Sequence, residues 1–376
     1  MVWKVQGMKV LMRETFLPGN RYALELCKEL KKHADIVLLC KRNAGEIENS
    51  VNCKKIIYTK SADKIRSIGS YFMSLVQEFK ELKKGKYDIY HIQSYKNLYL
   101  EVPLFYIAKK YCKAVVTTVH NVLPHEVAKS DRRLHELWYR TSDALIVHNE
   151  ATRECLIEEF PFTASKVHVI PHGTYSVQKY TGDCSEKNKK TAFLLFGQLR
   201  PYKGIDILIQ AIACLPSETR SVIQVVIAGN QHPKQDRTDY LDLIHKYHVE
   251  DCVDFQKGRV PDEALPEMFG RTDFCLFPYR EIYGSGALLM AYSYQKPVIA
   301  SNVPAFIEET DHGRTGLLFE NENSEDLAGK IETAVSLKKE EIDLYKSAIS
   351  ELVTEKYNWN VSARKLFETY RGIINR

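Results

Sequence analysis

Two cations stand in a loop between an apolar run at 192–196 and an apolar-periodic stretch at 205–215. These are Arg200 and Lys203, within residues 197–204. Because a helix N-terminus carries a partial positive charge and unpaired N–H groups, cations there are unfavourable unless an anion lies between them. The pattern predicts an anion-binding loop in preference to a solvated one.

A second candidate anion site is the run of small residues at 284–287, ahead of a predicted helix at 287–294. Ser285 can cap that helix, and a glycine lets a phosphate approach the backbone closely. An ordinary helix cap is the alternative. Nearby Glu281 either hydrogen-bonds sugar hydroxyls or pairs with Arg280 at the surface.

A histidine follows the predicted strand at 114–119. In a parallel sheet ligands bind beyond the carboxyl ends of the strands, so His120 is placed to contact a bound sugar or to fix its own loop. A metal pair with His125 is disfavoured, because a spacing of five with Pro124 between them is no helix-face pattern. Three further histidines end predicted strands and are weaker candidates: His91, His148 and His172.

Several motifs are absent. The chain has no Gly-x-Gly-x-x-Gly after its first strand, no Walker lysine loop, no His-Glu-x-x-His and no Gly-x-Ser-x-Gly elbow. It also lacks the Asp-x-Asp pair with which many sugar transferases hold a divalent cation on a diphosphate. A bound diphosphate would therefore be held by protein cations and backbone amides, so we expect no metal site and no cofactor.

The elements that must position these residues alternate between strand and helix in two series. Apolar runs predict strands at 8–12, 35–40, 89–93, 114–119, 144–147 and 167–170, and again at 192–196, 224–228, 274–277 and 297–300. Helical periodicity separates them, which predicts an α/β protein with two doubly wound parallel sheets. We expect domains at 1–175 and 191–359, a polar linker at 176–190, and a final segment, 360–376, that returns to the first domain.

The charge of +5 is unevenly distributed, since residues 1–175 hold 28 Lys and Arg against 19 Asp and Glu. Part of the excess surrounds an amphipathic segment at 71–82. A solvated helix face and attraction to an anionic membrane or a phosphorylated lipid acceptor are both open. No basic–aromatic nucleic-acid motif is present, and no apolar stretch is long enough to span a membrane. We expect a cytoplasmic protein, peripheral at the inner membrane face if the basic half binds lipid.

These motifs together resemble the GT-B glycosyltransferases of glycosyltransferase family 4. The most specific stretch is 196–211, with its Lys203-Gly204 before an apolar helix. The stretches at 273–301 and 313–319 also match, and residues 118–126 and 19–22 resemble the family's histidine loop and first glycine-containing loop.

The resemblance implies two Rossmann-like domains facing a cleft and transfer of a sugar from a nucleotide-diphosphate sugar, without an obligatory metal. The acceptor would be a saccharide or a polyprenyl-diphosphate-linked saccharide, in cell-surface polysaccharide assembly. The expected catalytic residues are His120, Arg200, Lys203 and Glu281. The expected donor-binding residues are Gly19, Asn20, Gly197, Arg200, Lys203, Asn230, Tyr283, Ser285, Gly286 and Ala287. The expected acceptor-side residues are His91, Asn121, His125 and Glu126.

The sequence departs from the family pattern at three positions. Gln198 stands where the family has an arginine, and Ile282 and Met290 stand where it has two glutamates. A Ser-Gly loop replaces that acidic pair. The identity of the donor is therefore open, as is retention or inversion at the anomeric carbon, with retention favoured. A nucleotide-sugar epimerase and an inactive sugar-nucleotide-binding protein remain alternatives.

Overall fold

The computed structural model describes residues 7–17, 21–44, 51–58, 64–123, 129–178, 180–182, 190–233 and 235–375. The chain forms two compact units, Met1–Gly173 with Asn358–Arg376 and Thr174–Tyr357. We call them unit 1 and unit 2. The described residues between 174 and 190, where the sequence predicted a linker at 176–190, are counted with unit 2.

Unit 1 is built on a seven-stranded parallel sheet with the order β3-β2-β1-β4-β5-β6-β7. Its strands are β1 (Lys9–Arg13), β2 (Asp35–Lys41), β3 (Asn52–Ile57), β4 (Ile89–Ile92), β5 (Ala114–Thr118), β6 (Ala144–Val147) and β7 (Val167–Val169). The central strands are buried along their whole length, because helices cover both faces of a parallel sheet. All strands therefore end at one edge, where β1 and β4 mark the point at which the strand order reverses.

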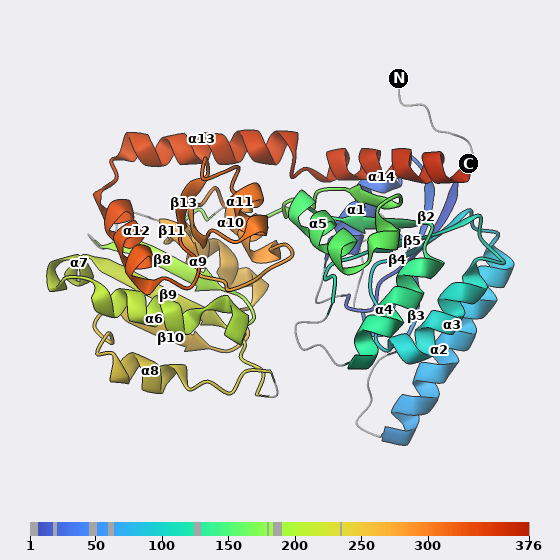
Figure 1. Ribbon diagram of the computed structural model, residues 1–376, viewed down its shortest axis with the longest axis horizontal. Coiled ribbons are helices and arrows are strands. Elements are labelled where there is room, and N and C mark those ends of the chain that lie inside the picture. The colour runs from blue at the N-terminus through green and yellow to red at the C-terminus, as the bar shows by residue number, and fades with distance from the viewer. Residues whose placement is uncertain are drawn as a thin grey trace. The chain divides into compact units, whose positions relative to one another are not determined.

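The helices of unit 1 are α1 (Tyr22–Leu30), α2 (Lys64–Gly85), α3 (Leu98–Ala108), α4 (Lys129–Thr141), α5 (Glu150–Glu159) and the C-terminal α14 (Trp359–Ile374). In Figure 1, α2 and α3 lie side by side in unit 1, and the two helices are in contact. No helix in the described part of the chain is long and apolar enough to cross a membrane.

Unit 2 contains a six-stranded parallel sheet with the order β10-β9-β8-β11-β12-β13. Its strands are β8 (Thr191–Phe196), β9 (Ile223–Gly229), β10 (Val253–Lys257), β11 (Phe274–Phe277), β12 (Val298–Ser301) and β13 (Gly316–Phe319). Its helices are α6 (Ile205–Cys214), α7 (Ser217–Ser221), α8 (Tyr240–Lys246), α9 (Leu265–Gly270), α10 (Gly286–Ser293), α11 (Pro304–Glu309), α12 (Ser324–Ser336) and α13 (Lys339–Glu355). The two doubly wound parallel sheets confirm the predicted fold class.

The C-terminal helix α14 packs on α1 in unit 1, as expected from the sequence. The side chain of Asn358 caps it by accepting a hydrogen bond from the N–H of Asn360, at 2.9 Å. Its apolar face then joins the core of unit 1 through Trp359, Ala363, Leu366, Phe367 and Tyr370. The end of the chain is therefore part of the core of the unit in which the chain begins.

We expect Leu366→Ala to lower the free energy of unfolding of unit 1 by about 2–5 kcal/mol, because Leu366 is 1% exposed and its removal leaves a cavity between α14 and the sheet. Urea unfolding followed by the fluorescence of the tryptophans in unit 1 measures this. Leu137→Ala is the matched control, since Leu137 on α4 of the same unit is 54% exposed and should change stability by less than about 0.5 kcal/mol. Equal effects of the two substitutions would contradict the packing role of α14.

Candidate functional site

The cation-bearing loop of unit 2 runs from the end of β8 to the start of α6. Residues Pro201–Lys203 form a turn of 3-10 helix, and Gly204 then adopts a left-handed conformation with a φ of 63°. A Cβ atom at Gly204 would lie 1.9 Å from the carbonyl oxygen of Pro278. Only glycine fits there, so the loop after β8 lies directly against the loop after β11.

Lys203 is buried in this loop and does not extend into solvent. Its side chain is 4% exposed, and its Nζ donates to the hydroxyl oxygen of Tyr279 at 2.6 Å and to the carbonyl oxygen of Phe196 at 3.3 Å. Burial, and then the neighbouring charge of Arg200, lowers the pKa of Lys203 to about 7. Near neutral pH this amine is therefore only partly protonated, and a nearby anion would favour its charged form.

Gly197 lies next to the amine. Its φ is 115°, and a Cβ atom on it would lie 3.2 Å from the Nζ of Lys203. A Cβ at Gly229, the last residue of β9, would in turn lie 1.7 Å from the carbonyl oxygen of Gly197. These two glycines bring the ends of β8 and β9 together and leave the amine free of a side chain on the side of Gly197.

Arg200 is half-buried at the start of the 3-10 turn, and it donates to the side chain of Gln198 at 3.3 Å. In the loop after β9, Asn230 is exposed, and its carbonyl oxygen accepts a hydrogen bond from the N–H of Leu199 at 3.0 Å. The structure thus places Gly197, Arg200, Lys203 and Asn230 in the loops at the carboxyl ends of the neighbouring strands β8 and β9.

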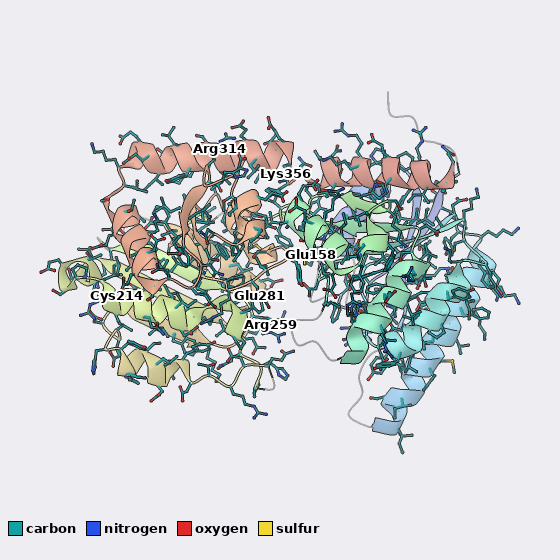
Figure 2. All side chains as sticks on the ribbon, in the orientation of Figure 1. Glu158, Cys214, Arg259, Glu281, Arg314 and Lys356 are labelled. Carbon is teal, nitrogen blue, oxygen red and sulfur yellow. The ribbon has the colours of Figure 1, made fainter. Side chains whose placement is uncertain are left out.

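Arg280 fixes the loop after β11 to the loop after β8. Its guanidinium forms two parallel hydrogen bonds with the carboxylate of Asp206, at 2.6 and 3.0 Å, and a third bond to Glu322 at 2.9 Å. Two-pronged arginine–carboxylate pairs of this kind add geometric specificity. Arg280 therefore positions the two loops relative to each other. Glu281 is exposed at the surface of unit 2 (Figure 2).

Ser285 caps α10, since its Oγ accepts a hydrogen bond from the N–H of Leu288 at 3.2 Å. The Ser285 side chain is also hydrogen-bonded to the hydroxyl of Tyr279. Tyr279 therefore connects the buried amine of Lys203 to the N-terminus of a helix of eight residues. Sequence reasoning missed Tyr279, although its place directly after β11 was a signal, because residues beyond strand ends in such sheets line the site.

The remaining donor-side candidates surround this cap. Tyr283, Gly286 and Ala287 are half-buried, and a Cβ at Gly286 would lie 2.9 Å from the hydroxyl of Tyr175. Ile282 and Met290 pack at the edge of an apolar cluster, where the family pattern has glutamates. Gly19 and Asn20 lie outside the described residues.

His91 in unit 1 is fully buried, so its side chain does not reach the protein surface. Its Nδ1 is hydrogen-bonded to the hydroxyl of Tyr370 on α14, and its Nε2 lies 2.8 Å from the Oγ1 of Thr118. Burial lowers the pKa of His91 to about 3, so it stays neutral. His91 therefore helps to hold α14 on the sheet through Tyr370. Its buried position does not support the expected acceptor-side role.

His120 follows β5 and belongs to a group of rings around Tyr22. The ring centres of His120, His148 and His172 lie 5.0, 5.1 and 4.8 Å from that of Tyr22. Tyr22, at the start of α1, was another residue that sequence reasoning missed. Burial is the main cause that lowers the pKa of His120 well below its usual value, followed by the charges of neighbouring histidines.

The hydrogen bonds of this group fix the tautomer of His120. The Nδ1 of His148 lies 3.1 Å from the carbonyl oxygen of Ile170, so it must carry the proton and donate. The Nε2 of His148 then accepts from the Nδ1 of His120, at 3.2 Å. The Nε2 of His120 is left as an acceptor, buried and without a partner among the described residues.

The other acceptor-side candidates give less information. Asn121 is exposed, and its carbonyl oxygen accepts from the hydroxyl of Tyr139 at 3.4 Å. His125 and Glu126 lie outside the described residues. Within the described ranges no group of three or more His, Cys, Asp or Glu side chains is arranged to hold a metal ion.

Solved structures share this two-sheet architecture. The crystal structure of Anabaena Alr3699/HepE in complex with UDP and glucose superposes with a TM-score of 0.76 at 17% identity, covering 97% of this chain and 100% of that one. With its parallel sheets of seven and six strands, the chain has the GT-B fold of such glycosyltransferases.

Two family models match the chain in succession. The model for Glycosyltransferase Family 4 matches residues 19–175, and the model for Glycosyl transferases group 1 matches residues 179–351. The chain therefore belongs to the glycosyltransferases that these two models describe, and the resemblance found in the sequence is confirmed.

Curated relatives carry glycosyltransferase names. A D-inositol 3-phosphate glycosyltransferase of Corynebacterium aurimucosum is 25% identical over 290 residues, which is 73% of this chain and 67% of that protein. A GDP-mannose:glycolipid 4-beta-D-mannosyltransferase of Xanthomonas campestris is 27% identical over 237 residues, 59% of this chain and 63% of that protein. Across six D-inositol 3-phosphate glycosyltransferases the matched part spans 52% to 67% of their length. These names favour transfer over the epimerase and the inactive binder that the sequence left open.

The low pKa of Lys203 makes the stability of unit 2 depend on pH. The native pKa of about 7 lies below the ordinary value of 10.5, so the unfolded chain binds an extra proton between these two values. The free energy of unfolding should therefore rise with pH from about 7 to 10. Over this range the free energy of unfolding of the wild-type protein should rise, relative to that of Lys203→Met, by up to roughly 1.4 kcal/mol per pH unit. Urea unfolding of both ligand-free proteins at pH 7.5, 8.5 and 9.5 measures the difference, and parallel pH profiles would contradict a buried, neutral-prone amine.

Proposed function

We propose that this chain transfers a sugar from a nucleotide-diphosphate sugar to a saccharide or polyprenyl-diphosphate-linked saccharide, in the assembly of a cell-surface polysaccharide or glycoconjugate. The observation that carries the proposal is the buried amine of Lys203 beside Gly197, at the carboxyl edge of the sheet in unit 2. The donor's diphosphate would lie over Gly197, between this amine, Arg200 and the N-terminus of α10.

The low pKa of Lys203 supports a role in the transition state. As the bond between sugar and diphosphate breaks, negative charge grows on the departing diphosphate. The anionic diphosphate of the bound donor favours the protonated form of this amine. The contact of the ammonium group then strengthens as further negative charge develops on the leaving diphosphate. Arg200 supplies a second, half-buried cation nearby. The reaction would proceed without a bound metal, with retention at the anomeric carbon favoured.

His120 is proposed to position the transferred sugar. Its Nε2 is an acceptor without a partner among the described residues, so a sugar hydroxyl would donate to it. Glu281, which is exposed, is proposed to accept from a second sugar hydroxyl.

Lys203→Ala should lower kcat/KM by about 30-fold to several hundred-fold, because removing one preorganised donor to a developing anion costs ~2–4 kcal/mol. The first measurement is hydrolysis of a panel of nucleotide sugars by the wild-type protein, which identifies the donor. The same assay on Lys203→Ala tests the role, with Lys246→Ala, an exposed lysine on α8, as the control. Activity of Lys203→Ala within twofold of wild type would refute the proposal.

We also propose that α2 binds an anionic membrane surface. Five large apolar side chains on this helix are exposed: Ile65, Ile68, Phe72, Met73 and Val76, at 82%, 53%, 50%, 51% and 46%. Further along the same helix, three exposed lysines follow these apolar side chains: Lys80, Lys83 and Lys84. An apolar stripe with a basic continuation complements a lipid surface with negative headgroups, which fits a lipid-linked acceptor.

Replacing Ile65 and Phe72 together by serine should weaken binding to vesicles of phosphatidylcholine and phosphatidylglycerol at least tenfold, because two apolar side chains no longer enter the lipid. Co-sedimentation measures the effect, and phosphatidylcholine alone should bind the wild-type protein weakly. The control replaces Leu241 and Leu344, which are 51% and 70% exposed in unit 2, by serine. If the α2 variant and the control sediment alike, α2 is not the membrane contact.

A further inference from the structure

Three neighbouring strands of unit 1 end in a group of two lysines and one phenylalanine. Lys41 is the last residue of β2, Phe16 follows β1, and Lys96 follows β4. The three strands are adjacent in the order β2-β1-β4, and the strand order of the sheet reverses between β1 and β4. In doubly wound sheets the reversal point is where ligands bind.

The two ammonium groups lie near one aromatic ring. The Nζ of Lys96 is 4.5 Å and that of Lys41 is 5.9 Å from the ring centre of Phe16, which is 44% exposed. Neither amine is within ion-pair distance of a carboxylate in the part of the chain that the structure describes. The pKa of Lys96 is lowered by partial burial and then by the charge of Lys41. The carboxylates of Glu14 and Glu101 act on Lys96 electrostatically and offset part of the repulsion between the two amines. A bound anion shared by both amines would offset more of it.

The buried side chain of Glu14 holds the backbone at Phe16 in place. Its buried carboxylate accepts hydrogen bonds through Oε1 from the N–H of Phe16 at 2.6 Å and from the Oγ of Ser94 at 2.7 Å. These bonds hold the backbone that carries the phenylalanine ring. The other oxygen, Oε2, is buried and has no hydrogen-bond partner among the described residues. Burial raises the pKa of Glu14, so this carboxyl opposes a nearby anion less than an ionised surface glutamate would.

We propose that Lys41 and Lys96 bind a phosphate group of the acceptor, with the ring of Phe16 between them against its apolar or sugar part. This rests on the proposed transfer function and names its acceptor class as phosphorylated. A phosphate monoester, or a diphosphate linkage taken as a whole, carries close to two negative charges, which match two separate ammonium groups better than a single carboxylate does. The Oε2 of Glu14, which has no partner in the described part of the chain, is a hydrogen-bonding position for a water or hydroxyl that accompanies the phosphate.

The phosphate can belong to a lipid-linked diphosphate or to a soluble sugar phosphate, and two probes separate these sources. Geranyl diphosphate stands for the first and glucose 1-phosphate for the second. Each is titrated calorimetrically into the full chain with the donor site saturated by UDP or GDP. We expect at least one probe to bind the wild-type protein and to bind the double variant Lys41→Gln/Lys96→Gln at least tenfold more weakly.

A matched control replaces the exposed lysines Lys246 and Lys339 of unit 2 by glutamine, which changes the net charge equally and should leave probe binding unchanged. Binding of geranyl diphosphate alone assigns the lipid-linked source, glucose 1-phosphate alone the soluble one, and both the phosphate itself. The inference is overturned if neither probe binds, if the Lys41/Lys96 variant binds as the wild-type protein does, or if glucuronate binds as tightly as the phosphates.

The test of the phosphate site can be distinguished from a test of the nucleotide-binding site in unit 2. Thermal stabilisation by UDP or GDP should be the same in the Lys41/Lys96 variant and the wild-type protein, because the residues proposed to hold the diphosphate, Gly197, Arg200 and Lys203, are unchanged in the variant. Equal melting temperatures of the ligand-free proteins show that the variant is folded. If no nucleoside diphosphate stabilises the wild-type protein, the proposed transfer function fails, and the probes titrated without nucleotide still test the phosphate site.

Discussion

The site in unit 2 depends on the burial of one ammonium group. Taking an amine out of water is unfavourable for its charged form, and two hydrogen bonds, to Tyr279 and to the carbonyl of Phe196, offset only part of that cost. The pKa of Lys203 therefore falls to about 7. The rest of the loop serves this placement: Gly204 permits the close approach to Pro278, and Gly197 places no side chain against the amine.

In unit 1, the buried polar groups at the strand ends include neutral histidines. Several histidines stand at the strand ends around Tyr22, and burial keeps them uncharged, with the pKa of His148 at about 4 and that of His172 at about 3. Their hydrogen bonds select one tautomer each, which ends in the unpaired Nε2 of His120. The returning helix α14 covers this group through Trp359, whose ring centre is 5.0 Å from that of His172. The chain end thus supports the polar edge of the sheet as well as its core.

The sequence predicted the central strands because buried parallel strands appear as unbroken apolar runs. It missed β3, β10 and β13, which lie at sheet edges. β3 and β10 are only partly buried and carry polar residues, and β13 is a short strand of four residues. It predicted anion binding at two loops, since their glycines and cations are local in sequence. It could not predict that Lys203 is buried, because the partner that holds it, Tyr279, is 76 residues away. Nor could it assign the charge state of His120, which depends on contacts among strands that are distant in sequence.

The central claim is that the amine of Lys203 binds the diphosphate of the donor. A crystal structure of the protein with a bound nucleoside diphosphate tests it most directly. The account predicts a phosphate oxygen about 2.8 Å from the Nζ of Lys203, on the side left open by Gly197. A nucleotide bound elsewhere, with Lys203 hydrogen-bonded only to Tyr279 and Phe196, would contradict it.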